Sequence, residues 1–404
     1  MAKKKTTKRS ATRKASKKRT PKKKIARKTP RPNSAATEPD STTRTIKFEN
    51  PDLDALISAL QQIVEETEGN QQPKIKKHYG RGDLVLALGA GVSLDHGLPD
   101  WNTLLQRLLL STIATNNDDT SSKAPLLAKI FARVFSPDPL IAARYLSLHF
   151  QSKSKQDPLA FVKAIREALY EDESTTRDSE LMSEIVKFCI AAGKTPNLDS
   201  IITYNYDNIV EQHLDQLDLG VPYSSIFHQG MHAKKNALPI YHVHGFLPPQ
   251  GKLTDKNKLV LSEELYHEQY TDVYHWSNLV QLTKFREKNC LFIGSSFTDP
   301  NLRRLLDIAN KMRGENTISH YMFKRKYNEN NVRQSLSELA KDPKYNFDSN
   351  DKKALRDKKT VKELISIMAN HESSDAKSFG VGIIWIDGWD EVPKYLREIR
   401  ESAN

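Results

Sequence analysis

The chain has 404 residues, with 62 Lys or Arg against 50 Asp or Glu and a formal net charge of +12. This length allows two domains, or one large domain that carries an insertion and a tail. Two cysteines exclude a four-cysteine zinc site, and no run approaches the roughly 20 apolar residues that cross a bilayer. We therefore expect no membrane partner, a soluble cytoplasmic protein, and buried thiols at Cys189 and Cys290.

The positive charge is concentrated at the N-terminus. Residues 1–32 contain sixteen Lys or Arg and no acidic residue, which leaves 46 basic against 50 acidic residues in the remainder. Such a segment cannot bury a core, so residues 1–50 are predicted to form a disordered tail. An unfolded cationic arm suits the phosphates of nucleic acid, because neutralising them releases counterions. A solubilising or targeting tail is the alternative.

The next part of the chain predicts a helix, a connector and the start of a folded body. Apolar residues at helical spacing within 52–66 indicate an amphipathic helix, and residues 68–82 are expected to be a connector. The body, residues 83–404, begins with the apolar run 84–88, typical of a strand buried on both faces of a parallel sheet. A helix is predicted over 98–113, followed by a helical insertion at about 115–195.

The strand pattern then returns six times, at 200–203, 239–244, 259–261, 290–293, 320–323 and 381–386. Most of these runs are separated by helical stretches, and a last helix is expected around 391–401. This alternation predicts an α/β fold, with a doubly wound, Rossmann-like parallel sheet.

A glycine-rich turn follows the first predicted strand. Gly89-Ala90-Gly91 would place backbone N–H groups and a helix dipole where the pyrophosphate of a dinucleotide could lie. Dehydrogenase spacing would put a third small residue at position 94, but Leu94 stands there. Alone, the turn is weak evidence for a ligand, and a tight strand-to-helix turn is the alternative.

The longer run from Gly89 to Trp101 resembles the sirtuin signature, glycine-alanine-glycine-x-serine followed by glycine-leucine-proline-aspartate-aromatic. Three further sirtuin-like blocks follow in the same chain order: Thr203-Tyr204-Asn205-Tyr206-Asp207, His244-Gly245 and Gly294-Ser295-Ser296. Over about residues 83–400, the chain is most similar to the sirtuin-like NAD hydrolase domains of bacterial anti-phage defence proteins.

The resemblance implies that NAD+ is the substrate and assigns roles to the blocks. Asn205 and Asp207 would hold the nicotinamide ribose and carboxamide, and His244 would be the catalytic base. Helix capping is the alternative for Asn205 and Asp207, and Asp299 or Thr298 is a candidate cap ahead of Pro300. The remaining NAD-binding candidates are Gly89, Ala90, Gly91, Ser93 and Asp100, with Gly294, Ser295 and Ser296 on the adenosine side.

The position of His244 in the sequence also suits a general base, independently of the resemblance. It ends an apolar strand, where ligands of open α/β sheets bind, and a histidine can accept a proton near neutral pH. His242 shares its face of the strand, and His228 and His232 are four residues apart, so a metal site must be weighed. Neither spacing brings a clear third ligand, so we expect no metal.

The expected activity is hydrolysis of NAD+ to nicotinamide and ADP-ribose, in an NAD-depleting anti-phage effector. The missing zinc cysteines, and Tyr204 and Asn102 in place of the family's glutamine and arginine, disfavour the peptide deacylation of other sirtuins. A deacylase or ADP-ribosyltransferase is the first alternative. The second is a non-catalytic module that senses NAD or ADP-ribose and binds nucleic acid. Control by homo-oligomerisation, or by an ATPase or other defence partner, is also expected.

Overall fold

The computed structural model describes residues 71–114, 138–153, 157–171, 179–190, 197–217, 220–314, 318–345 and 347–401. All of them lie within one compact unit, residues 51–404. The predicted tail over 1–50 and the predicted helix over 52–66 lie outside the described residues. No helix in the described ranges combines the length and apolar character needed to cross a bilayer.

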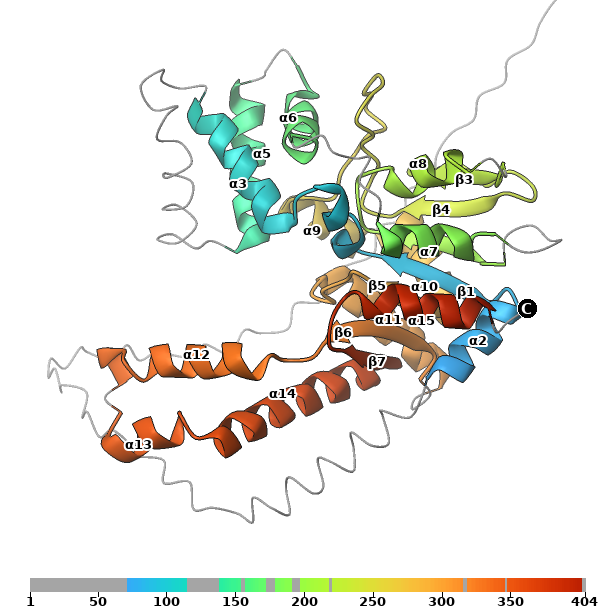
Figure 1. Cartoon of the computed structure of the whole chain (residues 1–404). Coiled ribbons are helices and arrows are strands. Elements are labelled where there is room, and N and C mark those ends of the chain that lie inside the picture. Colours follow the sequence, from blue (N-terminus) through green and yellow to red (C-terminus); the bar gives the residue numbers. More distant parts are fainter. Residues whose placement is uncertain are drawn as a thin grey trace, which may run out of the picture. The chain divides into compact units, whose positions relative to one another are not determined.

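The described strands form a seven-stranded, wholly parallel sheet, which confirms the predicted doubly wound α/β fold (Figure 1). Their order across the sheet is β3-β4-β2-β1-β5-β6-β7. The chain therefore adds strands on one side of β1 and then crosses back to the other side through β5. The strands are β1 Leu84–Leu88, β2 Ser200–Thr203, β3 Tyr223–Ile226, β4 Leu238–His242, β5 Asn289–Ile293, β6 His320–Arg325 and β7 Val381–Ile386.

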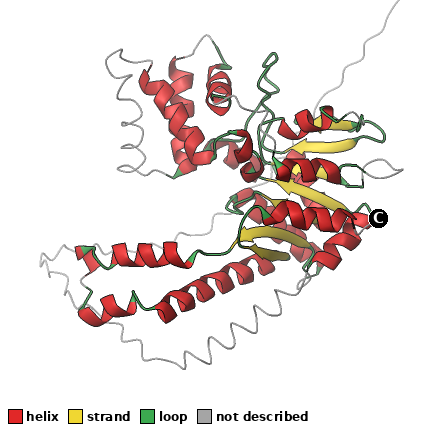
Figure 2. Ribbon diagram, viewed as in Figure 1, coloured by secondary structure: helices red, strands yellow, loops and turns green. Residues whose placement is uncertain are grey.

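Strand β1 shows why the sheet is covered on both faces. All five of its residues are buried, with Leu84, Leu86 and Leu88 in one apolar cluster and Val85 and Ala87 in a second. Successive side chains of a strand point to opposite faces, so a continuous apolar run is what a doubly covered strand requires. Helices cover the sheet (Figure 2). One of them, α2, precedes β1 in the sequence, and the others follow it.

The described part of the connection from β1 to β2 is helical, as predicted for about 115–195. It contains α3 Trp101–Ala114, α5 Pro139–Lys153, α6 Ala160–Leu169 and α7 Glu180–Phe188. Helix α3 packs on α5 and α6, and α7 packs on α8 and α15. The later helices are α8 Ile209–Asp215, α9 Glu263–Thr271, α10 Trp276–Glu287, α11 Pro300–Arg313, α12 Glu329–Leu339, α13 Ser349–Ala354, α14 Lys358–Ser378 and α15 Glu391–Glu401.

Three local predictions are wrong. Residues 72–80 of the predicted connector form helix α2, Gln72–Gly80, because Ile75 and Tyr79 lie one turn apart and bury a common face. Residues 259–261 carry no strand, since Val260 instead donates its N–H to the His244 carbonyl at 2.8 Å. Strand β3 was not predicted, because it is short and only its last residue is fully buried.

A buried carboxylate joins α7 to the last helix, α15. Glu184 is fully buried, and its oxygens lie 2.9 Å from Lys187 Nζ, 3.2 Å from Arg397 Nε and 3.2 Å from Arg400 Nη2. Burial alone would raise the pKa of Glu184, but these three cations together hold it below its ordinary value.

We expect Glu184→Gln to lower the free energy of unfolding by about 2 kcal/mol at neutral pH, because three cations lose a buried partner. The matched control is Glu180→Gln, which removes an exposed carboxylate that also contacts Arg397. It should lower the free energy of unfolding by no more than ~0.5 kcal/mol. The contribution of Glu184 is present above its unfolded pKa and lost as the pH falls through its lower folded value. Urea denaturation should therefore show the difference between the wild type and Glu184→Gln shrinking in acid.

The turns after β1 and β5 touch backbone to backbone. A Cβ on Gly91 would lie 2.7 Å from the Gly294 Cα, and a Cβ on Gly294 would lie 2.6 Å from the Val92 nitrogen. Gly294 also has a φ of +67°, a conformation that glycine adopts without strain. Both glycines are therefore required by packing, independently of any ligand.

Gly91→Ala should lower the stability of the ligand-free protein by about 2 kcal/mol, since the added methyl group overpacks a rigid backbone contact. Gly80→Ala is the matched control, because a Cβ there meets nothing within 4 Å. Thermal unfolding of both variants without NAD+ checks this. Equal stability of Gly91→Ala and the wild type would contradict the requirement for glycine in the packing of these two turns.

Candidate functional site

The four sequence blocks end four neighbouring strands. Gly89 follows β1, Tyr204 follows β2, His244 lies just beyond β4, and Gly294 follows β5. These strands are adjacent in the order β4-β2-β1-β5 and all run parallel, so their carboxyl ends share one edge of the sheet. The reversal of strand order between β1 and β5 lies at this edge, which is where open α/β sheets bind ligands.

Asn205 connects the first two blocks. Its Nδ2 donates to the Gly89 carbonyl at 3.1 Å and to Ser93 Oγ at 3.0 Å, and Ser93 Oγ in turn donates to Asp207 Oδ2 at 2.9 Å. Asn205, Ser93 and Asp207 are all buried. Within the described residues, Oδ1 of Asn205 has no hydrogen-bond partner, which leaves this oxygen as an acceptor at the sheet edge.

Asp207 contacts the start of α8 as well as the network. Its Oδ1 accepts from the backbone N–H of Ile209, the first residue of α8, at 3.1 Å, but the N-cap of that helix is Asn208 and no side chain caps it, so the capping alternative is wrong for Asp207. Burial raises the pKa of Asp207, and the bonds from Ile209 and Ser93 offset only part of that effect. The site therefore holds a carboxyl group whose neutral form is favoured more than usual.

A buried histidine–carboxylate contact lies behind Asn205. His242 Nε2 is 2.7 Å from Glu211 Oε1, which also accepts from Ser225 Oγ at 2.7 Å, and His242 Nδ1 is 3.4 Å from the Asn205 carbonyl. Burial would raise the pKa of Glu211, but His242 brings it below its ordinary value. Sequence reasoning missed Glu211, because it lies 31 residues from its partner. The described residues contain no group of three His, Cys, Asp or Glu side chains suited to a metal.

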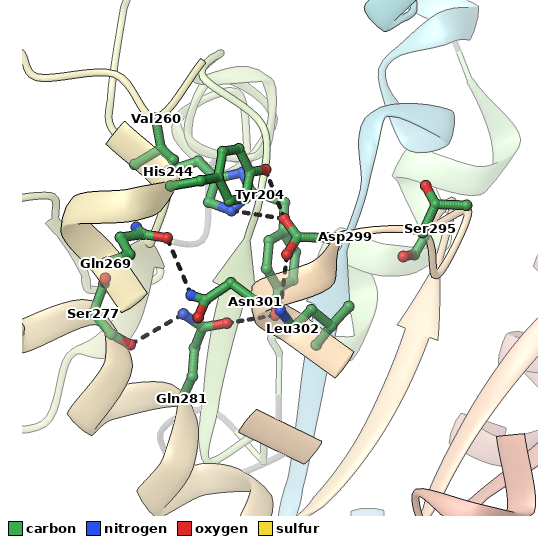
Figure 3. A network of polar contacts seen from close by, with 12 residues as sticks. Tyr204, His244, Val260, Gln269, Ser277, Gln281, Ser295, Asp299, Asn301 and Leu302 are labelled. Atoms are coloured by element: carbon green, nitrogen blue, oxygen red, sulfur yellow. Dashed lines mark hydrogen bonds and ion pairs between the residues drawn. The ribbon is translucent and has the colours of Figure 1, made fainter. Parts of the chain in front are cut away.

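His244 is held by the turn that follows β4. Gly245 has a φ of +104°, and a Cβ there would lie 2.1 Å from the Lys258 carbonyl, so the histidine-glycine pair requires its glycine. The His244 ring packs with the rings of Tyr204 and Tyr266 at 5.0 and 5.8 Å between centroids, both edge to face. Its Nε2 lies 3.1 Å from Asp299 Oδ2. Figure 3 marks this contact between His244 and Asp299 with a dashed line.

Asp299 is the second residue that sequence reasoning undervalued. It was expected only as a helix cap, and the cap is confirmed, because its Oδ1 accepts from the Leu302 N–H at 2.8 Å at the start of α11. Its Oδ2 faces His244 and accepts from the Tyr266 hydroxyl at 2.8 Å. Burial would raise the pKa of Asp299, but the contacts with His244, Leu302 and Tyr266 hold it below the ordinary value.

Buried amide side chains lie next to His244 and Asp299, below them in the view of Figure 3. Tyr204 donates its hydroxyl to Gln281 Oε1 at 2.8 Å. Asn301, in the first turn of α11, donates to Gln269 Oε1 at 3.1 Å and to Asn278 Oδ1 at 3.0 Å. Tyr204 is therefore fixed in place from α10, and it presents its ring to His244.

The remaining candidates lie at the two turns and make local contacts. The Gly91 N–H donates to the Gly294 carbonyl at 2.9 Å. It is therefore not available to a pyrophosphate, contrary to the expectation from the sequence. Ser295 Oγ accepts from the Phe297 N–H, while Ser296 and Ala90 are exposed at the edge. Asp100 is exposed and accepts from the Thr103 N–H at the start of α3. The glycines are followed by 3-10 turns at Ala90–Val92 and Leu94–His96, and α3 begins only at Trp101.

Known proteins match the part of the chain that carries most of these groups. Residues 199–347 match the SIR2-like domain family, a segment that includes Asn205, Asp207, His244 and Asp299. The chain is 23% identical over 206 residues to "NAD(+) hydrolase ThsA" of Enterococcus faecium, and 28% identical over 209 residues to "NAD(+) hydrolase ThsA" of Cytobacillus dafuensis.

These matches cover 51% and 50% of this chain but 38% and 36% of the two relatives, so the chain matches less than two fifths of their length. The family match begins just before β2, and the glycine turn at 89–91 lies upstream of it. Asn205 nevertheless binds Gly89 and Ser93 directly, so the turn and the matched segment build one site. The chain therefore contains a SIR2-like domain and is homologous to the ThsA NAD(+) hydrolases.

Proposed function

We propose that this protein hydrolyses NAD+ to nicotinamide and ADP-ribose. The observation that carries the proposal is the convergence of Asn205, His244 and the glycine turns at one sheet edge, within and beside the segment that matches a SIR2-like domain. The names of the two relatives support the same reaction, because both are NAD(+) hydrolases.

The chemistry of the side chains fits cleavage of the bond between nicotinamide and ribose. As that bond ionises, the ribose carbon becomes oxocarbenium-like and can accept a water molecule. The Asn205 Oδ1 would accept a hydrogen bond from a ribose hydroxyl or from the water, and His244 would take the proton that the water loses. Holding the reactants at this edge supplies much of the rate enhancement. We propose no metal in this mechanism.

The pyrophosphate would lie beside the two glycine turns. Gly89, Gly91 and Gly294 pack backbone against backbone, so the space between the turns is filled and the ligand would lie along the outer side of this contact. Because the Gly91 N–H already pairs with Gly294, we propose that exposed groups such as the Ser296 hydroxyl supply polar contacts. Asp207 would contact the nicotinamide carboxamide while it holds Ser93 in place.

Transfer of ADP-ribose or deacylation of a protein remains the competing activity. The helical connection between β1 and β2, and a sequence with only two cysteines, favour hydrolysis because a four-cysteine zinc module cannot be built. Mass spectrometry of the products separates the reactions. Free ADP-ribose supports hydrolysis, whereas acyl-ADP-ribose or a modified protein would contradict it. A module that binds NAD or ADP-ribose without turnover would yield neither product.

We further propose that the protein acts in the cytoplasm as an NAD-depleting anti-phage effector. An unregulated NAD hydrolase would deplete its own cell, so its activity must be controlled. Self-association, or a partner such as an ATPase or another defence protein, would supply that control. Full activity of the isolated monomer would contradict this expectation.

The catalytic prediction is tested by nicotinamide release from NAD+ by the full chain, assayed alone, with DNA, and with an extract of infected cells. His244→Ala and Asn205→Ala should each reduce turnover by about 10²-fold or more, because the base or the orienting amide is lost. His232→Ala is the matched control, since His232 is exposed. Full turnover by both site variants would overturn the assignment.

The basic tail generates a separate prediction. Deleting residues 1–32 should abolish the salt-dependent binding of a labelled DNA duplex, because the deletion removes sixteen cationic side chains. Fluorescence anisotropy over a series of salt concentrations measures this. Unchanged binding by the shortened chain would show that the tail does not contact nucleic acid.

A further inference from the structure

We propose that Asp299 is a positioning residue that fixes the His244 ring, so that Nδ1 is the nitrogen that accepts the proton. This inference rests on the proposed function, since it assigns the orientation of its base. Asp299 lies outside the four sirtuin-like blocks, and its place at the start of α11 had suggested only a helix cap.

The geometry leaves the ring little freedom. The two tyrosine rings of Tyr204 and Tyr266 pack edge to face against His244, and Asp299 Oδ2 lies 3.1 Å from Nε2. The His244 carbonyl also accepts from the Val260 N–H at 2.8 Å, which holds the backbone of the turn. Within the described residues, Nδ1 of His244 has no hydrogen-bond partner, so it is the nitrogen left for the substrate.

Asp299 is itself held rigidly. Its Oδ1 caps α11 through the Leu302 N–H, and its Oδ2 accepts from the Tyr266 hydroxyl. The first turn of α11 is fixed in turn by Arg303, which forms two 2.8 Å bonds to Asp375 on α14 and lies 4.5 Å from the Phe379 ring centroid. A carboxylate anchored at both oxygens can orient its neighbour precisely enough for proton transfer.

The charge of Asp299 decides the tautomer of His244. An ionised carboxylate only accepts hydrogen bonds, so the Nε2 that faces it carries the hydrogen, and neutral His244 keeps its lone pair on Nδ1. A positive helix terminus and a donating tyrosine both favour the ionised form of Asp299. When Nδ1 accepts a proton, the imidazolium lies beside a carboxylate in a largely buried site, which stabilises it.

The substitution Asp299→Asn separates this role from capping. Asparagine caps helices as well as aspartate does, so its Oδ1 can still accept from Leu302. Its Nδ2 then faces His244 and can only donate, so Nε2 must become the acceptor and the hydrogen moves to Nδ1. We expect kcat to fall by roughly 10²-fold or more, with KM changed little, because the base presents the wrong nitrogen.

The experiment uses the full chain and has two readouts. Nitrogen-15 NMR of labelled histidine reports which ring nitrogen of His244 carries the hydrogen, without any need for NAD turnover, with His244→Gln to assign the signal. Steady-state kinetics of NAD+ hydrolysis supplies the second readout. Wild-type protein with the hydrogen on Nε2, a shift to Nδ1 in Asp299→Asn and a lower kcat would support the inference.

Two further variants complete the test. Asp307→Asn removes an exposed carboxylate on the same helix, α11, which pairs with Lys311 and lies outside the contacts that hold Asp299, so it should keep the wild-type tautomer and kcat. Asp299→Ser keeps a capping residue without the carboxylate, and it replaces Asp299→Asn if that variant does not fold. It should also lower kcat.

The outcomes distinguish this inference from the proposed function. If the wild type hydrolyses NAD+ and Asp299→Asn does so equally well, the positioning role is overturned and the function stands. A wild-type hydrogen on Nδ1 also overturns the role, whatever the activity. If the wild type shows no turnover but the tautomer changes in Asp299→Asn, the function fails while the orienting role of Asp299 is supported.

Discussion

The close contact between the turns after β1 and β5 is the constraint on which the site depends. Gly91 donates its N–H to the Gly294 carbonyl at 2.9 Å, and no side chain could fit between the two backbones. This contact sets the spacing of the sheet edge. The turn after β1 continues to Ser93, which accepts a hydrogen bond from Asn205. The turn after β5 continues through Phe297, whose φ is positive, to Asp299. A change at either glycine would therefore displace both halves of the site.

Two carboxyl groups at this edge have environments that move their pKa values in opposite directions. Asp207 is buried, and burial raises its pKa by more than the bonds from Ile209 and Ser93 and the nearby His242 lower it. Asp299 is half-buried, but it lies beside His244 and accepts from a helix N-terminus and a tyrosine, so its pKa is lowered. Such a separation allows one group to stay neutral and the other to stay charged at the same pH. In the proposed mechanism, the charged group orients the base.

The site is also assembled from segments that are far apart in the sequence. The SIR2-like match begins after the helical connection that follows the glycine turn, yet the turn and the matched segment share hydrogen bonds through Asn205, Ser93 and Asp207. Parallel strands explain this, since each strand returns the chain to the same edge after a helical crossover. The connection can therefore vary in length without moving the residues that it joins.

The sequence by itself determined the α/β class, five of the seven strands together with most of β4, and the four blocks at the strand ends, because buried parallel strands are continuous apolar runs and glycine turns follow them. It also narrowed the cap ahead of Pro300 to Asp299 or Thr298, because capping is a local pattern, and the structure shows that the cap is Asp299. Only the tertiary structure decided that Asp299 faces His244 and that Glu211 pairs with His242. It also decided that the Gly91 N–H donates to the Gly294 carbonyl. These contacts join residues separated by tens to hundreds of positions, and local periodicity carries no information about which distant groups a fold brings together.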